Sequence, residues 1–203
     1  MPYPVRAMAD PGWIRARAAR AGQKVRALFM GGDFPRKGGP DLLEAWRAGG
    51  FFYRAALDLV TDWPMSEGDL PPGVRLVGGI APYTPSWLDL WRGADLFVMP
   101  TRHEAFGMVF QEAAAAGLPS IATRINAIPE IVQDGATGIL VASGDRAGLV
   151  RAIQTLVDSA ELRRTMGAVA FDRIRVLNAP ARYASRLEAL MHSVLDQHER
   201  HQT

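Results

Sequence analysis

The sequence has no cysteine among its 203 residues, which excludes disulfide bonds and catalysis by a thiolate. It also lacks any uninterrupted apolar run of the roughly 18–20 residues that span a bilayer, and its first residues lack the apolar core of a secretory signal peptide. Blocks of one charge are missing too, since 23 basic residues oppose 21 acidic ones. This balance does not indicate a nucleic-acid partner. We therefore expect a cytoplasmic protein with no transmembrane segment, either free or associated peripherally with the inner face of the membrane.

The chain is instead built from short apolar runs that alternate with amphipathic helical segments. Apolar residues occupy both faces of the runs, which is typical of parallel strands covered by helices on both sides. The alternation predicts an α/β fold: a single Rossmann-like, doubly wound domain with a parallel six-stranded sheet and extra C-terminal helices. Expected strands are 24–32, 53–61, 73–80, 95–101, 118–124 and 135–142; expected helices are 40–49, 84–94, 107–117, 128–134, 145–159, 160–177 and 180–201.

The expected domain covers residues 23–198. Residues 1–22 are rich in proline and arginine and are expected to form an N-terminal arm or linker, with a short helix at Trp13–Ala21. Residues 199–203 are expected to be a polar tail. In folds of this class ligands bind beyond the carboxyl ends of the strands, so the strand-to-helix junctions are where a site is expected.

The first such junction reads "GGDFPRKGG", residues 31–39. Glycines such as Gly32 let the backbone approach a ligand closely, and Arg36 and Lys37 supply cationic donors for phosphate oxygens. Two interpretations stay open for this stretch alone: a diphosphate clamp or a solvated basic turn. It is neither a Walker A loop nor a GxGxxG motif.

The second junction reads "PTRHEAFGM", residues 100–108. Phe106, Gly107 and Met108 are expected to form the first turn of a helix, whose unpaired amides can hold an anion. Glu104 lies just before this turn, where it is either a site residue or an ordinary capping residue. Glu112 is expected about two turns into the helix, where it is either a ligand for a ribose diol or a solvent-facing residue.

The third junction, "TRINAIPE", precedes a short helix that begins with Pro129 and Glu130. Its loop, with Asn126, is either a second anion cradle or simple helix initiation. His103 adjoins Glu104 and is expected to line the same pocket. No clustered pattern of Asp, Glu and His suggests a bound metal, so neither a metal nor another cofactor is expected.

Together these junctions resemble a known family. Glu104 to Glu112 reads E-x7-E, "EAFGMVFQE", followed by "EAAAAGLPSIAT" and "IPEIVQDGATGILV", with "FMGGDFPRKGGPDLLEAW" and "VRLVGGI" upstream. The ordered set, from about Val25 to Val157, is similar to the C-terminal, donor-binding half of glycosyltransferase family 4, the retaining enzymes of the GT-B fold. The resemblance implies transfer of a sugar from a UDP, GDP or other nucleoside diphosphate sugar, as in polysaccharide biosynthesis, without a metal.

The resemblance also implies a role for each matching residue. Glu104 would face the donor sugar and the reaction centre as the catalytic residue, and Glu112 would bind the ribose hydroxyls. The remaining matches are the diphosphate-binding residues Arg36, Lys37, Gly32, Phe106, Gly107 and Met108, and the base-proximal residues Val77, Gly79 and Ile80.

The sequence departs from the family in three respects. Gly32 or Asp33 stands where the family often has a further arginine, and Asn126-Ala127 stands where it usually has Gly-Gly. The N-terminal half of a GT-B enzyme, which carries the acceptor site, has no match here. Alternatives therefore remain: a non-catalytic nucleotide-binding module, or a subunit that needs a separate N-terminal-domain protein. The last helix would then offer an apolar face to such a partner or to a second copy, and this face holds Tyr183, Leu187, Leu190 and Met191.

Overall fold

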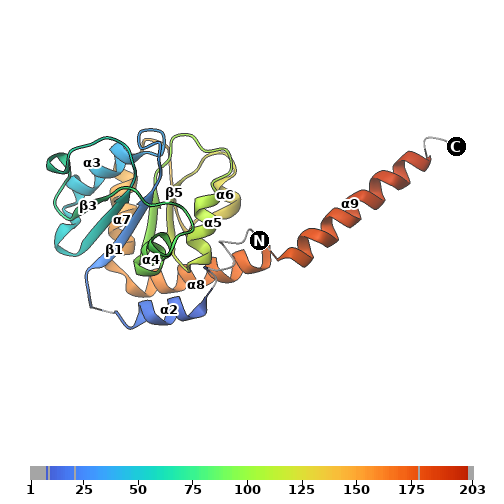
Figure 1. Ribbon diagram of the computed structural model, residues 1–203, viewed down its shortest axis with the longest axis horizontal. Helices are drawn as coiled ribbons and strands as arrows, with labels where there is room; N and C mark the ends of the chain where they lie inside the picture. The colour runs from blue at the N-terminus through green and yellow to red at the C-terminus, as the bar shows by residue number, and fades with distance from the viewer. Residues whose placement is uncertain (1–7, 9, 21, 178, 201–203) are drawn as a thin grey trace.

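A six-stranded parallel sheet forms the centre of the computed structural model, which describes residue 8 and residues 10–20, 22–177 and 179–200. The strand order is β3-β2-β1-β4-β5-β6 (Figure 1). This confirms the predicted doubly wound α/β fold. The strands are β1 (Val25–Met30), β2 (Ala55–Val60), β3 (Val74–Val77), β4 (Leu96–Met99), β5 (Ser120–Thr123) and β6 (Gly138–Val141).

Strands β4 and β5 are buried along their whole length, as expected for a parallel sheet covered on both faces. The Phe97 ring of β4 lies between Trp91 and Phe110, with ring centroids 5.2 and 5.6 Å apart. This aromatic row joins the sheet to the two helices that precede and follow β4.

Helices cover both faces of the sheet (Figure 1). The helices α3 and α7 pack together on one face, and α5 and α8 pack together on the other, where α4 also lies. Thr84 caps α4 as predicted, since its hydroxyl accepts a hydrogen bond from the Trp87 amide. The helices are α2 (Pro11–Ala18), α3 (Gly39–Gly49), α4 (Pro85–Gly93), α5 (Met108–Ala115), α6 (Ile128–Ile131), α7 (Arg146–Asp158), α8 (Ala160–Leu177) and α9 (Pro180–Arg200).

The N-terminal helix α2 is tied to the edge of the sheet where the strands begin. Arg17 donates hydrogen bonds to the carbonyl oxygens of Ala94 (2.6 Å), Ala116 (3.0 Å) and Gly117 (3.1 Å), at the ends of α4 and α5. Carbonyl groups at helix C-termini have no partner within the helix, so a buried guanidinium is a suitable donor for them. The helix expected near Trp13–Ala21 therefore packs on the body; residues 1–7, 9 and 21 lie outside the described residues.

The last helix, α9, extends away from the sheet and its covering helices (Figure 1). Its apolar residues Leu187, Leu190 and Met191 are exposed. Tyr183, expected on the same face, lies outside the side chains that the structure describes, as do residues 201–203 of the expected tail. Within the described ranges, no helix is both long enough and apolar enough to cross a membrane.

Candidate functional site

The candidate site lies where the strand order reverses, between β1 and β4. These strands are neighbours, and the chain continues from β1 towards β2 and β3 but from β4 towards β5 and β6. At such a switch point the loops after the two strands lead to helices on opposite faces of the sheet, and ligands of this fold class bind there. The predicted residues Arg36 and Lys37 follow β1, and His103 and Glu104 follow β4.

The two loops are joined by an ion pair between Lys37 and Glu104. Both side chains are largely covered, with 15% and 13% of their surfaces exposed. The Lys37 chain lies across Gly31, where an added Cβ would come 2.9 Å from the Lys37 Cγ atom. The Glu104 carboxylate is therefore a lysine partner rather than the helix cap that remained as an alternative. In the free protein the ammonium group of Lys37, the strongest candidate phosphate ligand, is therefore neutralised by the Glu104 carboxylate, which is expected to face the donor sugar.

Arg36 is also held by contacts across the loops. Its guanidinium donates to Asp33 Oδ2 (2.8 Å) and to the His103 carbonyl oxygen (2.9 Å), and its own carbonyl accepts from the Arg102 amide (2.9 Å). The hydrogen bonds from Arg36 lower the pKa of the Asp33 carboxyl. The His103 side chain is exposed. Gly32 beside them is open, because no atom lies within 4 Å of the place of a Cβ.

The start of α5 approaches the same point. The helix begins at Met108, and Gly107 precedes it with a φ of 85°, a left-handed conformation that favours glycine. An added Cβ at Gly107 would lie 2.9 Å from the Phe110 ring and 3.5 Å from Glu104 Cγ. Phe106, expected in the first turn, lies in the preceding loop instead. The backbone amides in the first turn of α5 are therefore next to Glu104, in the position that an anion-binding helix N-terminus requires.

Glu112 is buried, with 8% of its surface exposed, so the alternative of a solvent-facing residue is wrong. It is the fifth residue of α5, just over one turn from the start rather than two turns. Burial raises the pKa of the Glu112 carboxyl to about 7, and the nearby Tyr83 hydroxyl acts in the opposite direction. A carboxyl group buried in this way is typical of a site that binds hydroxyl groups or takes part in chemistry.

Tyr83 is the residue that the sequence did not single out. It lies in the loop from β3 to α4, has a φ of 68°, and packs its ring edge-on against Trp87 with centroids 5.0 Å apart. Burial raises the pKa of the Tyr83 hydroxyl, and the charge of the nearby Glu112 carboxylate raises it further. The only signal was its position in "GGIAPYT", one of the loops at the carboxyl ends of the strands. No periodicity distinguishes such a tyrosine from a surface residue.

The expected base-proximal residues lie at the end of the edge strand. Val77 ends β3, and the Gly79 amide donates to Asp62 Oδ1 (2.7 Å). Ile80 is partly buried against the core. Gly79 and Ile80 therefore lie in the loop that also carries Tyr83, directly after the end of β3 at Val77.

The third junction contributes Asn126, whose side-chain amide donates to the Glu104 carbonyl oxygen at 2.7 Å. Its φ of 46° is left-handed, a conformation that asparagine tolerates better than most residues. The helix that follows, α6, has only four residues. Asn126 therefore supports the Glu104 loop.

A further support was not expected from the sequence. Arg102 donates two hydrogen bonds of 2.9 Å to the carboxylate of Asp41, which is buried in α3, and Arg146 of α7 donates to the same carboxylate at 3.0 Å. These hydrogen bonds lower the pKa of the Asp41 carboxyl, that from Arg102 most. The loop after β4 is therefore anchored to α3 and α7 directly before His103.

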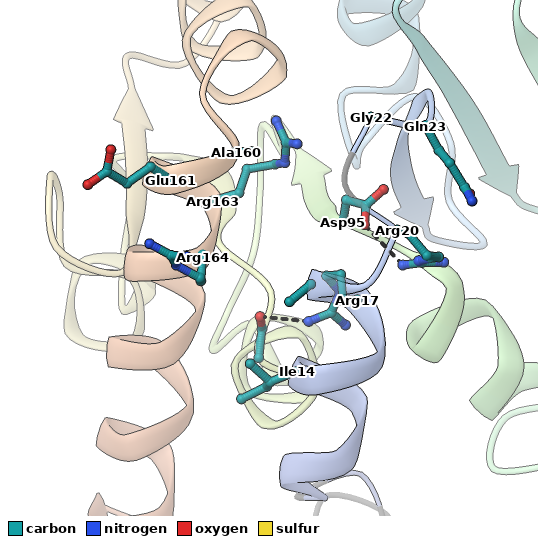
Figure 2. A pocket seen from close by; sticks show the side chains of 12 residues that line it. Ile14, Arg17, Arg20, Gly22, Gln23, Asp95, Ala160, Glu161, Arg163 and Arg164 are labelled. Carbon is teal, nitrogen blue, oxygen red and sulfur yellow. Dashed lines mark hydrogen bonds and ion pairs between the residues drawn. The ribbon is translucent and has the colours of Figure 1, made fainter.

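A cavity of about 230 Å³ lies at the end of the sheet where the strands begin, opposite the candidate site. It is enclosed by α2, the start of β4 and α8 (Figure 2). Two of the arginines that line it bind helix ends: Arg17 binds those of α4 and α5, and Arg163 donates to the last carbonyl groups of α7. Burial lowers the pKa of the Arg17 guanidinium to about 10, against the attraction of Asp95. We interpret this cluster as a clamp that holds α2 and α8 on the domain.

A family model described as "Glycosyl transferases group 1" matches residues 24–159. An N-acetyl-alpha-D-glucosaminyl L-malate synthase from Bacillus anthracis is 39% identical over 103 residues, which are 50% of this chain and 27% of that protein. The chain spans about a quarter of the length of the first curated relatives it matches.

Solved structures are similar over most of the chain. Sucrose-phosphate synthase (tll1590) from Thermosynechococcus elongatus has a TM-score of 0.75 and 25% identity, covering 95% of this chain and 51% of that one. Anabaena Alr3699/HepE, solved in complex with UDP-glucose, has a TM-score of 0.69 and 21% identity, covering 90% of this chain and 55% of that one. The second likeness shows the fold alone. Both agree with the α/β fold expected for one domain of a GT-B protein.

Proposed function

Because the chain belongs to the group 1 glycosyl transferases, we propose that it supplies the donor-binding domain of a retaining, metal-independent glycosyltransferase of family 4. Residues 23–198 would be the nucleotide-sugar-binding domain. The observation that carries the proposal is the convergence of Lys37, Glu104, the start of α5 and the buried Glu112 at the switch point of the sheet. The nucleotide-sugar donor is further supported by HepE, a neighbour of the same fold that was solved with UDP-glucose.

The diphosphate of the donor would replace Glu104 as the partner of Lys37. Transfer breaks the bond between the anomeric carbon and the diphosphate, so negative charge grows on the leaving group. Lys37 and the first-turn amides of α5 are placed to stabilise that charge without a metal. Arg36 would assist by leaving its contact with the exposed Asp33. Glu104, released from Lys37, would then face the sugar, where a carboxylate stabilises positive character at the anomeric carbon.

Glu112 would accept hydrogen bonds from the ribose diol. A carboxylate can accept from both hydroxyl groups, which fixes the nucleoside relative to the diphosphate. The end of β3 at Val77 and the loop with Gly79 and Ile80 would lie beside the base.

The acceptor site would come from a second domain or a partner chain. The chain covers 51% and 55% of the two solved structures described above, which supports this proposal. The exposed residues Leu187, Leu190 and Met191 of α9 are available for a contact with such a domain or with a second copy. Without that contact the chain would bind nucleotide but transfer no sugar.

Calorimetric titration with UDP, GDP and ADP tests the proposal. We expect at least one to bind with a Kd in the range of about 1 µM to 1 mM, the usual range for enzyme substrates. The affinity should be equal in EDTA and in magnesium, because the protein cations serve the diphosphate. If none of the three binds to protein that circular dichroism shows to be folded, the proposal is wrong.

A further inference from the structure

Two ion pairs join the segment after β1 to the loop after β4. Lys37 binds Glu104, and Arg102 binds Asp41 in the first turn of α3. Arg102 lies two positions before Glu104, and Asp41 lies four positions after Lys37, so both ion pairs link the same two stretches of chain. The Arg102 amide adds a backbone hydrogen bond of 2.9 Å to the Arg36 carbonyl oxygen. The two stretches are therefore held together at several neighbouring points.

The contact between Arg102 and Asp41 has a fixed geometry. The guanidinium donates two hydrogen bonds of 2.9 Å, one to each carboxylate oxygen, and the Asp41 side chain is only 3% exposed. A planar contact at two points fixes the orientation of both groups, and the N-terminus of α3 favours the negative charge. The backbones also meet here, because a Cβ added at Gly38 would come 2.0 Å from the Pro100 carbonyl oxygen. Arg102 thus fixes where the chain leaves β4 relative to α3.

Nucleotide binding would affect the two ion pairs differently. The diphosphate would take Lys37 from Glu104, so the first ion pair would open, whereas the pair of Arg102 with Asp41 can stay closed. We propose that Arg102 is a positioning residue: its contact with Asp41 holds the loop after β4 in place when the donor diphosphate has taken Lys37. This inference rests on the proposed function, in which Lys37 changes its partner.

Arg146 offers a matched comparison for Arg102. Both arginines bind the Asp41 carboxylate, and their side chains have similar exposure, 53% and 49%. Arg146 begins α7 and also binds Glu44, so its contacts join α7 to α3. Removal of either arginine leaves the other one on Asp41, and the buried carboxylate keeps a cationic partner. The two substitutions therefore differ in whether the loop after β4 loses its anchor.

Arg102→Met is expected to weaken binding of the nucleoside diphosphate about 3- to 30-fold, the range for residues that act on a ligand without touching it. The loop after β4 leads into the first turn of α5, whose amides would hold the same diphosphate. A loop that has lost its anchor must be ordered again on binding, which costs affinity. Arg146→Met should lose stability but bind like the wild type.

Asp41→Asn should weaken binding in the same way, because it removes the charge that holds Arg102. The two substitutions act on one contact, so the double variant Arg102→Met/Asp41→Asn should bind no more weakly than the weaker single variant. An arginine with a merely structural role would lower the free energy of unfolding without changing the affinity. Urea denaturation of each variant gives the change in stability beside the change in affinity.

The experiment is calorimetry of the wild type and these variants with UDP, GDP and ADP. We expect weaker binding by Arg102→Met and by Asp41→Asn, with unchanged binding by Arg146→Met. Equal affinities of Arg102→Met and Arg146→Met would overturn the inference. Wild-type affinity in Asp41→Asn beside weak binding by Arg102→Met would overturn it as well, because Arg102 would then contact the ligand itself.

A measurement without nucleotide keeps this inference separate from the proposed function. Lys37→Met opens the first ion pair as the diphosphate would, and the amide of residue 102, bonded to the Arg36 carbonyl oxygen, reports whether the two stretches stay together. This amide should lose protection from hydrogen exchange in Lys37→Met/Arg102→Met but not in Lys37→Met/Arg146→Met. Equal protection in the two would overturn the inference. If protection differs but the wild type binds no nucleotide, the proposed function fails, and only the anchoring of the loop by Arg102 remains.

Discussion

Glu112→Gln is expected to make the free protein more stable at pH 8 by about 3 kcal/mol, while it weakens nucleotide binding. The carboxyl is buried, and its pKa is raised from 4.5 to about 7. Each unit of difference between the folded and unfolded pKa corresponds to about 1.4 kcal/mol. Glutamine keeps the shape and some hydrogen-bonding capacity but has no charge to bury. Glu112 would thus be retained for binding at the expense of stability.

The direction of the pH dependence follows from proton binding. Below pH 4.5 the carboxyl is protonated in both states, so wild type and variant differ little in stability. Between pH 4.5 and 7 the unfolded chain releases this proton while the folded chain keeps it. The wild type therefore loses stability relative to the variant as pH rises, and the difference levels off above pH 7.

Urea denaturation of both proteins at pH 4.5, 6 and 8 measures this difference. Other groups whose pKa is shifted, such as Asp41, contribute equally to both proteins and cancel. Glu188→Gln, on the exposed surface of α9, controls for loss of a carboxylate as such. A stability difference that is the same at all three pH values would contradict the account of a protonated, buried Glu112.

Lys37→Met is expected to weaken binding of the nucleoside diphosphate about 10- to 100-fold. The loss corresponds to the roughly 1.5–3 kcal/mol of a hydrogen bond to a charged group. Methionine keeps the aliphatic chain that lies across Gly31 but removes the ammonium group. Titration calorimetry of the variant with the nucleotide that binds the wild type gives the ratio of the two Kd values.

Two further proteins make the Lys37 result decisive. Lys24→Met removes the same charge from the opposite edge of the sheet, where Lys24 donates to the Phe52 carbonyl oxygen, and should bind like the wild type. The double variant Lys37→Met/Glu104→Gln avoids leaving the Glu104 carboxylate without its lysine, so it tests binding if the single variant unfolds. Wild-type affinity in a folded single or double variant would rule out the phosphate role of Lys37.

The strands and the positions of the site loops could be predicted from the sequence because both depend on local patterns. The run Leu96–Met99 is apolar on both faces, and only a sheet covered on both sides buries such a run. The sequence also predicted that a helix begins near Gly107. In the structure the helix begins at Met108, and Phe106 lies in the preceding loop. Each of these features depends on residues that are adjacent in the sequence.

The partners of the site residues could not be predicted in this way. Lys37 and Glu104 are 67 positions apart, and they meet because β1 lies next to β4, an adjacency that alternating strands and helices do not specify. The same holds for the hydrogen bonds between Arg102 and Asp41, which are 61 positions apart. Residue types predicted the candidate ligands of the site, whereas the strand order determines that two of them, Lys37 and Glu104, are already paired with each other in the free protein.

A crystal structure of the chain with the nucleoside diphosphate selected by titration tests the central claim most directly. The account predicts diphosphate oxygens at Lys37 Nζ and at the first-turn amides of α5, with the ribose hydroxyls on Glu112 and the ion pair of Lys37 with Glu104 broken. A nucleotide bound elsewhere, for example in the arginine-lined cavity beside Arg163 (Figure 2), with that ion pair intact, would contradict it.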